Sequence, residues 1–353
     1  MRPSSYELSF LVPFLLIWAT PGSGQELATL DASLAARFGL SADDLRDLSK
    51  GKLVVNVPKS EDEYEVEVIG AIRVDAPVGF LIERLREVEA ALLADEVVLS
   101  SGLFSQIPDS GDLQDLELAK SDIKALRDCK PGACNFKLTA PSIERIRSQV
   151  DWSRSGHEVE ARALVAGDLA EMLRAYIARG ETALPIYGDK PEPLAVADGF
   201  RILRDNVRPI LEQDAELAGF LADLTGDRWP QVETTYYWSV EDYGVRPVIT
   251  LNHVVVMPTS GGNGHQATMA VKHLYASHYI HAGFKIALLA SVSEAQPEQG
   301  TYYLLFMRLR FDAHVTGLKR LLLRSRVRET WEDQLKSWRE DSEKSFRALV
   351  TPG

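Results

Sequence analysis

The sequence predicts an α+β protein with a large antiparallel β-sheet, a helical middle segment and one long C-terminal helix. Two patterns indicate this class. Apolar and polar residues alternate in segments before residue 105 and after residue 230, and a period of two is typical of half-buried antiparallel strands. Apolar residues recur at helical spacing from about 110 to 228 and again from 317 to 349. The 353-residue chain, 45% hydrophobic and 25% charged, is long enough to bury a large core.

The first 24 residues have the pattern of a secretory signal peptide. Arg2 precedes an apolar run from Leu8 to Ala19, and small residues with a proline follow it. The run is shorter than the roughly 20 apolar residues that span a bilayer. We therefore expect cleavage near Gly24 and an exported, periplasmic protein that is soluble after cleavage. The alternative is that the segment stays as an N-terminal membrane anchor.

Residues 25–50 predict an N-terminal helical segment, in which Ser41 and Asp44 have the spacing of a helix start. The segment from 51 to 105 begins the predicted sheet. In YEVEVIGAIRV the apolar residues alternate with charged ones, which predicts a strand. Asp75 and Pro77 then end this strand and begin the helix FLIERLREVEAALL, because aspartate caps helices and proline suits a first turn. VVLSSGLF predicts a second strand.

Residues 106–229 predict a helical insertion that carries both cysteines of the chain. Cys129 and Cys134 flank a Pro131–Gly132 turn that can bring them together. A thioredoxin-like redox pair has two intervening residues, and a zinc site needs ligands beyond the one nearby histidine, His157. We predict a structural disulfide, which an oxidising compartment favours. A redox pair or half of a zinc site are the alternatives.

Residues 230–349 predict an antiparallel meander that is followed by the terminal helix. Turn-rich loops separate four strand segments, and the helix carries an apolar stripe that is expected to pack on the sheet. The expected strands are VETTYYWSVEDYG, RPVITLNHVVVMP, ATMAVKHLYASHYIHAGFKIALLASV and TYYLLFMRLRFDAH; the apolar stripe is Leu318, Leu321, Leu322, Trp331, Leu335 and Trp338.

Three segments of the chain together resemble START-like and polyketide-cyclase-like domains. They are the strand that ends in IGAIRVDAP and runs into a helix, the closing meander, and the helix GLKRLLLRSRVRETWEDQLKSWREDSEKSF. The resemblance to this SRPBCC, or helix-grip, superfamily covers residues 51–105 and 230–349. It implies a curved antiparallel sheet gripping the long C-terminal helix, with an apolar cavity between them. The insertion at 106–229 is a departure, since compact members have short connections there.

The stretch KHLYASHYIHAGF, residues 272–284, is interpreted as one strand because its residue types favour a strand. His278 then lies alone on an apolar face that includes Phe284, and His273 and His281 lie on the opposite face. Those two are about 26 Å apart on a straight strand, so we expect no metal site. His278 is expected either to bind a ligand or act as a general base, or to be a hydrogen-bonded core histidine.

Two further groups supply candidate ligand contacts. Arg308, Arg310 and Asp312 alternate in MRLRFDAH; they predict either a cross-strand ion network or a site for an anionic group. The expected acidic partners are Glu233, Glu241, Asp242 and Asp312. Aromatic residues are dense in TYYWSVEDYG, and such rings suit a pocket wall or a packed sheet. The predicted ligand-binding residues are His278, Arg308, Tyr236, Trp238 and Phe284.

The family resemblance implies an exported binding protein for an apolar or amphipathic small molecule of the lipid type. One alternative is an acid–base enzyme of the cyclase, isomerase or hydrolase type, with His278 as base and Arg308 or Tyr279 stabilising developing charge. Another is a cell-envelope interaction module that uses residues 155–225. The net charge of −12 argues against nucleic acid. No phosphate-loop, dinucleotide or nucleophile-elbow motif occurs, so we expect no cofactor; the sequence predicts no oligomeric state.

The start of the terminal helix is strongly basic, which suggests a transient contact with a membrane surface. Cationic helix faces bind anionic lipid headgroups. The alternative is a solvated face that pairs with acids of the sheet. The basic residues are Lys319, Arg320, Arg324, Arg326 and Arg328.

Overall fold

The computed structural model describes most of the chain after residue 31. The expected signal peptide lies outside this part. The described residues are 32–95, 97–207, 215–222, 232–242, 244, 246–259, 266–293, 296 and 299–351.

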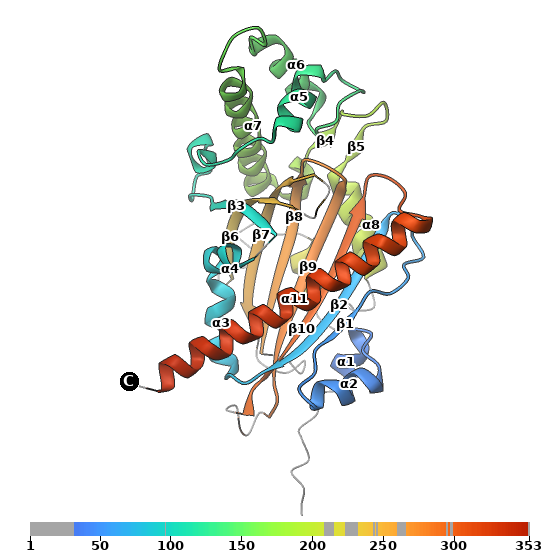
Figure 1. Cartoon of the computed structure of the whole chain (residues 1–353), viewed down its shortest axis with the longest axis vertical. Coiled ribbons are helices and arrows are strands. Elements are labelled where there is room, and N and C mark those ends of the chain that lie inside the picture. The colour runs from blue at the N-terminus through green and yellow to red at the C-terminus, as the bar shows by residue number, and fades with distance from the viewer. Residues whose placement is uncertain are drawn as a thin grey trace, which may run out of the picture.

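The described chain is α+β, as predicted, with one eight-stranded sheet in the order β1-β2-β10-β9-β8-β7-β6-β3. All neighbouring strands are antiparallel. β2, from the N-terminal part, pairs with β10, the last strand, which brings the two parts of the predicted sheet together (Figure 1). The strands are β1 Val54–Asn56, β2 Glu65–Val74, β3 Val98–Leu103, β6 Glu233–Glu241, β7 Val248–Pro258, β8 Ala267–Ala276, β9 Ile280–Ser291 and β10 Thr301–Phe311.

Helices connect and cover the strands. Two short ones precede the sheet, two more link β2 to β3, and the insertion between β3 and β6 is mostly helical with a two-stranded ribbon. The elements are α1 Ala32–Arg37, α2 Ala42–Ser49, α3 Val78–Arg86, α4 Val88–Ala94, α5 Lys120–Asp128, α6 Ala140–Gln149, α7 His157–Arg179, β4 Ile186–Tyr187, β5 Leu194–Ala195, α8 Val196–Asn206, α10 Ala215–Ala222 and α11 Gly317–Val350.

Local signals explain two of these boundaries. Ser41 caps α2, and its side chain and that of Asp44 form the reciprocal capping box that the spacing predicts. Asp75 does not cap α3, which corrects the sequence prediction. Pro77 occupies the N-cap position instead, and no side chain caps that helix.

The predicted disulfide joins Cys129 to Cys134. The chain reverses between them, with Lys130 and Ala133 in a β-bridge and Gly132 at φ 79°, a conformation that glycine adopts without strain. No helix in the described part of the chain is long and apolar enough to cross a membrane.

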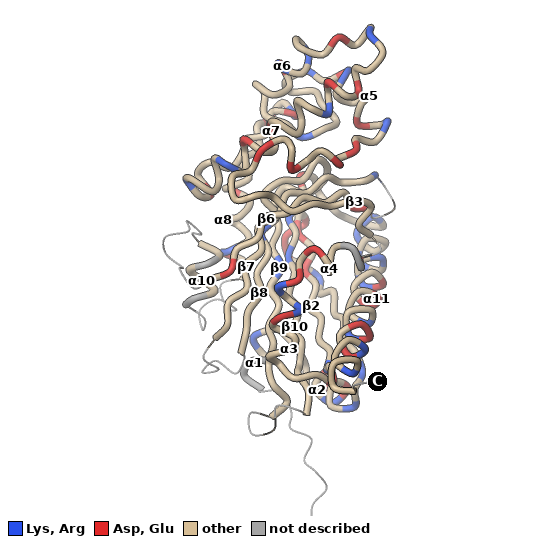
Figure 2. The backbone as a smooth tube through the Cα atoms, turned by 90° about the vertical axis from the view of Figure 1, so that its left-hand side faces the viewer, with Lys and Arg blue, Asp and Glu red and all other residues tan. Residues whose placement is uncertain are grey.

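The sheet is buried on both faces rather than half-buried, because each face has its own helical layer. Figure 2 shows α11 on one side of the sheet and α8 with α10 on the other. One apolar cluster joins the sheet to α1, α2 and the insertion, and a second joins it to α3 and α11. β7 shows the result: ten of its eleven residues are buried.

α11 is held to its face of the sheet by large side chains. Trp338 packs on Tyr303 with ring centroids 4.2 Å apart, and Phe346 packs on Phe80 of α3 at 5.3 Å. Leu335 lies directly over Gly70 of β2, where a Cβ atom would come within 2.8 Å of Leu335 Cδ1. The absence of a side chain at position 70 therefore lets the helix approach the sheet closely.

Candidate functional site

The histidine-rich stretch 272–284 forms a hairpin, which corrects the prediction of a single strand. β8 ends at Ala276, residues 277–279 make the turn, and β9 begins at Ile280. Tyr279 has a φ of 57°, a left-handed conformation that is uncommon outside glycine. The turn contains Ser277 but no Gly, Pro, Asn or Asp, so most of the residues that usually mark a turn are missing from it. Tyr279 is 42% exposed.

The hairpin separates the histidines that the sequence placed on one strand. His281 faces the insertion, and its Nε2 lies 2.7 Å from the backbone oxygen of Ala195. His273 lies opposite Gly283 and Asn252 on the face that α11 covers. No cluster of three or more potential metal ligands occurs among the described residues.

Tyr236, Trp238 and Phe284 lie on the face of the sheet that is turned away from α11. They pack in the cluster formed with the insertion, and Trp238 Nε1 donates a hydrogen bond to the backbone oxygen of Asp112 at 2.8 Å. Arg308 shares this face, since it lies opposite Phe284 in the β9–β10 pair. The helix-grip resemblance, which implies a cavity between the sheet and the terminal helix, would place this apolar face under α11. The assignment was wrong because the insertion supplies a second apolar layer, and alternation alone does not show which layer covers which face.

His278 belongs to a buried ion network between the hairpin and the insertion. Its Nε2 lies 3.1 Å from Asp122 Oδ1, and its ring meets Phe136 edge-on with centroids 5.4 Å apart. Arg246 Nε donates to the same carboxylate oxygen at 2.8 Å. His278 is 5% exposed, so these contacts favour a hydrogen-bonded core histidine over a general base.

Arg308 and Arg310 form the cross-strand ion network that was one of the two interpretations of their pattern. Arg308 donates to Glu65 and Glu67 of β2 at 2.6 Å each, and Arg310 donates to Glu65 at 2.8 Å and to Asp62 at 2.7 Å. These partners are on or near β2, because β10 pairs with β2. In the described structure Arg308 contacts none of the acids expected from the sequence, which were Glu233, Glu241, Asp242 and Asp312.

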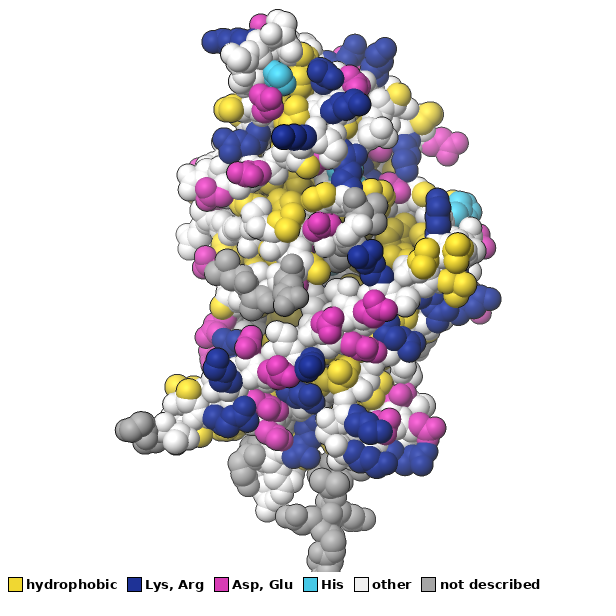
Figure 3. Space-filling model, in the orientation of Figure 1, with side chains coloured by type: hydrophobic (Ala, Val, Ile, Leu, Met, Phe, Trp, Pro, Cys, Tyr) yellow, Lys and Arg dark blue, Asp and Glu magenta, His cyan; other side chains and the backbone are white. Residues whose placement is uncertain are grey.

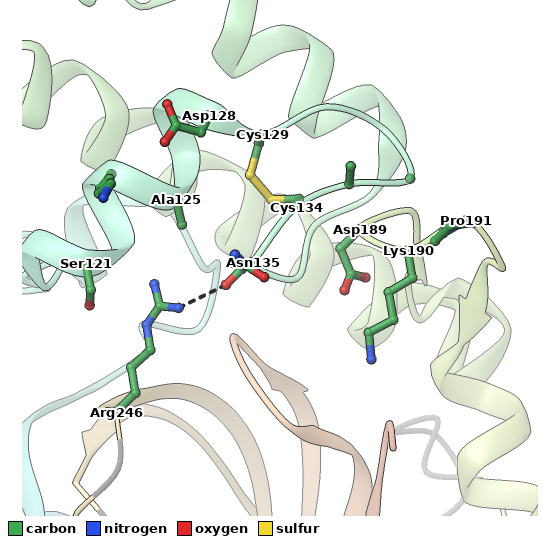
Figure 4. Close-up of a pocket in the computed structure, with 13 residues that line it drawn as sticks. Ser121, Ala125, Asp128, Cys129, Cys134, Asn135, Asp189, Lys190, Pro191 and Arg246 are labelled. Carbon is green, nitrogen blue, oxygen red and sulfur yellow. Dashed lines mark hydrogen bonds between the residues drawn. A yellow bond between two sulfur atoms is a disulfide. The ribbon is translucent and has the colours of Figure 1, made fainter. Parts of the chain in front are cut away.

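A polar pocket of about 580 Å³ opens where the insertion meets the end of the sheet. Figure 4 shows Arg246, Asp189 and Lys190 around it, with the disulfide on its wall. Lys190 Nζ lies 3.1 Å from Asp312 Oδ2, and burial raises the pKa of the Asp189 carboxyl. Charged groups of both signs line this pocket, so it suits a small polar molecule better than an apolar one.

A second buried histidine, His253 of β7, is held by hydrogen bonds and stacking. Its Nδ1 lies 3.0 Å from the Tyr176 hydroxyl of α7, and its Nε2 lies 3.2 Å from Thr234 Oγ1. Its ring stacks on Tyr236 at 4.4 Å. Burial, with a smaller contribution from the Lys272 ammonium, lowers the pKa of His253 to about 3.

We expect His253 to make the protein less stable as the pH falls below about 6.5. The unfolded histidine titrates near its ordinary pKa of about 6.5, whereas the folded one stays neutral to about pH 3. The unfolded state therefore binds the proton first, and this site lowers the free energy of unfolding by up to about 1.4 kcal/mol per pH unit within that window. Urea unfolding of the wild type and of His253→Phe between pH 7 and pH 4 measures this pH dependence of the free energy of unfolding. Parallel pH profiles for the two proteins would contradict the expectation.

The face under α11 holds polar residues that are not among the predicted ligand contacts. Asn252 and His273 are cross-strand neighbours, and Lys285 lies two residues beyond Gly283, the β9 partner of His273. Burial lowers the pKa of His273 to about 4 and also lowers that of Lys285. Burial, followed by the charge of Glu241, raises the pKa of the Tyr237 hydroxyl on the same face. The signal is a lysine inside the apolar run FKIALLA, because charged residues are rarely buried without a partner.

Apolar side chains surround these polar groups. His273 and Lys285 are only half-buried, although they lie on central strands of the sheet, so this face is not sealed from solvent. Figure 3 shows hydrophobic side chains at the surface between α11 and the insertion. The apolar neighbours on this face are Val254, Val256, Met269, Val271, Ala287, Leu289, Leu305 and Met307 of the sheet, with Leu81, Trp331 and Trp338 from the helices.

The start of α11 exposes three leucines of the predicted apolar stripe instead of packing them on the sheet. Leu318, Leu321 and Leu322 are 70%, 62% and 63% exposed. Two cations of the basic run face the other way: Arg320 donates to the backbone oxygen of Ser60 and Arg324 to that of Val57. The stripe reaches the sheet only further along the helix.

Comparison with family models, curated proteins and solved structures finds no match to this chain.

Proposed function

We propose that this chain is an exported carrier of the START-like, helix-grip type that binds an apolar or amphipathic small molecule between the sheet and α11. The element order supports the fold assignment: β2, two helices, β3, the insertion, a meander and a long terminal helix, with β2 paired to the last strand, β10. The disulfide supports export, because such bonds persist in oxidising compartments.

The observation that carries the proposal is the half-buried polar group at the centre of the α11 face. A sheet face that only packed a helix would be apolar and closed. Here His273 and Lys285 keep partial solvent access among apolar side chains, which is the composition of small-molecule sites. The apolar surface of a ligand placed there would contribute about 25 cal/mol per Å² buried, before the costs of association.

The other two functions receive less support. An acid–base enzyme that uses His278 and Arg308 would need both side chains to contact a substrate. His278 instead hydrogen-bonds the carboxylate of Asp122, and Arg308 hydrogen-bonds those of Glu65 and Glu67. For an interaction module, the described part of residues 155–225 exposes two large hydrophobic side chains, Val159 and Ile186. They lie on different elements and make no extended patch of the kind that marks interfaces.

Native mass spectrometry of the protein purified from its periplasmic fraction tests the carrier function. We expect an adduct of several hundred daltons that is lost on denaturation. The denatured mass tests export separately, through cleavage near Gly24 and the loss of two hydrogens in the disulfide. If no adduct survives purification, titration with the neutral apolar dye N-phenyl-1-naphthylamine replaces it, and the absence of saturable binding would overturn the proposal.

A pair of variants locates the bound molecule. Ala287 and Ala290 are both buried on β9, but Ala287 faces α11 and Ala290 faces the insertion. We expect Ala287→Met to weaken dye binding and Ala290→Met to leave it unchanged, because only the first side chain enters the proposed site. Circular dichroism and thermal unfolding establish that both variants fold.

We further propose that the carrier docks transiently on an anionic membrane through the exposed leucines at the start of α11. Leu318, Leu321 and Leu322 are neighbours on one helix face, and Lys319 adjoins them. Replacing all three leucines with serine should weaken binding to phosphatidylglycerol-containing vesicles about tenfold or more, since each inserted leucine contributes on the order of 1 kcal/mol. Leu349→Ser, at the exposed far end of the helix, is the control. Equal vesicle co-sedimentation of both variants would contradict the docking site.

A further inference from the structure

Lys285 lies at the centre of the α11 face, and no described residue places a carboxylate beside it. It lies in the middle of β9, between Val271 of β8 and Met307 of β10. Its Nζ lies 5.6 Å from the centroid of the Trp331 ring on α11. Among the described residues, none places a carboxylate oxygen within ion-pair distance of this ammonium group.

The buried lysines on the opposite face are paired. Lys272 Nζ lies 2.7 Å from Glu181 Oε1, and Lys137 Nζ lies 3.0 Å from Asp312 Oδ2. An ammonium group that is partly removed from water without a partner is unfavourable. Lys285 therefore differs from them in carrying a charge that the described residues leave uncompensated at close range.

The nearest acids of this face are committed to other groups. Glu241 accepts hydrogen bonds from Ser239 at 2.6 Å and from Thr250 at 3.2 Å. Asp95 accepts one from Gln334 of α11 at 2.8 Å. Both carboxylates act on Lys285 through space and oppose the lowering of its pKa by burial, but neither forms an ion pair with it.

Two more polar atoms beside Lys285 have no hydrogen-bond partner among the described residues. They are Oδ1 of Asn252, a residue with no exposed surface, and Nδ1 of His273. Asn252 Nδ2 is already used, since it donates to Thr250 at 2.7 Å. Gly283 makes room for the histidine ring, because a Cβ atom there would come within 3.0 Å of His273 Cδ2. Buried polar atoms are normally satisfied, so this group is missing a partner.

We infer that the ligand of the proposed carrier is an apolar chain that ends in one anionic group, of the fatty-acid class, and that Lys285 binds that group. A carboxylate supplies the missing counter-charge and oxygen acceptors for the ammonium. His273 Nδ1, in the tautomer that carries its proton there, donates to the same carboxylate, and a water that donates to both oxygens links it to Asn252 Oδ1. The chain then lies against the valine, methionine and tryptophan side chains of this face. This inference rests on the proposed carrier function, and it names the class of ligand that the proposed site binds.

Isothermal titration with dodecanoate and with its neutral analogue 1-dodecanol tests the inference on the delipidated full chain. We expect the wild type to bind the carboxylate about tenfold more tightly than the alcohol, which is the value of one charge-assisted contact. Lys285→Met should lose this preference while its affinity for the alcohol stays the same. Lys285→Arg should keep part of it. Lys336→Met, on the exposed side of α11, is the matched control and should behave as the wild type.

The outcomes separate the two proposals. If wild type and Lys285→Met bind acid and alcohol with equal affinity, the anionic ligand is ruled out and the carrier function stands. If neither compound nor the neutral dye binds the wild type, the carrier function itself is wrong. If Lys336→Met loses the preference as fully as Lys285→Met does, the effect is one of overall charge and the assigned role of Lys285 is overturned.

Discussion

Replacing Glu65 with alanine is expected to destabilise the protein by about 3–5 kcal/mol, because it removes one partner of a buried ion network. Glu65 is completely buried. Its carboxylate accepts hydrogen bonds from Arg308 at 2.6 Å, from Arg310 at 2.8 Å and from Asn206 of α8 at 2.9 Å. Without it, two arginines that are themselves mostly buried keep only the more exposed acids Glu67 and Asp62.

Urea unfolding, followed by circular dichroism, measures this loss. The control is Glu63→Ala, two residues away, whose side chain is 56% exposed beside His314 and should contribute less than about 1 kcal/mol. Glu65→Gln keeps the shape of the side chain and part of its hydrogen bonding, so its loss of stability should lie between those of Glu65→Ala and Glu63→Ala. Equal midpoints for Glu65→Ala and Glu63→Ala would show that the network adds nothing to stability.

Replacing Leu335 with alanine is expected to lower the free energy of unfolding by about 2–5 kcal/mol. Leu335 is 2% exposed and fills the space over Gly70, so its truncation leaves a cavity between α11 and the sheet. Loosening this contact should also weaken N-phenyl-1-naphthylamine binding, because α11 forms one wall of the proposed site.

Leu349→Ala is the matched control for this change. It lies on the same helix at 71% exposure, where the same truncation should change stability by no more than about 0.5 kcal/mol. If the two variants unfold at the same urea concentration, α11 is not held to the sheet by Leu335.

Much of the fold follows from local patterns in the sequence. The period of two predicts the strands on either side of the insertion, and the helical period predicts α7 and α11. The capping box of Ser41 and Asp44 and the turn at Gly132 also depend on residues that are close in the chain. Such features are predictable because both partners of each interaction lie within one short segment.

The candidate site was less predictable, because its residues are brought together by long-range pairing. Arg308 contacts Glu65 and Glu67 only because β10 pairs with β2, and no local pattern shows that register. The hairpin turn before β9 contains no Gly, Pro, Asn or Asp, so its two strands have the sequence pattern of one continuous strand. Together with the second apolar layer from the insertion, this is why the sequence pattern indicates His278 and not Lys285 as a ligand contact.

The pairing of β2 with β10 also constrains the order in which the molecule can fold. Glu65 and Arg308, which meet across this pair, are 243 residues apart in the chain. At a synthesis rate of about 5–20 residues per second, β2 emerges roughly 12–50 s before its main partner exists. Until then its other neighbour in the sheet is the three-residue β1. A long unpaired apolar strand is prone to aggregate, so we expect the nascent chain to be most prone to aggregation before its last strand is complete.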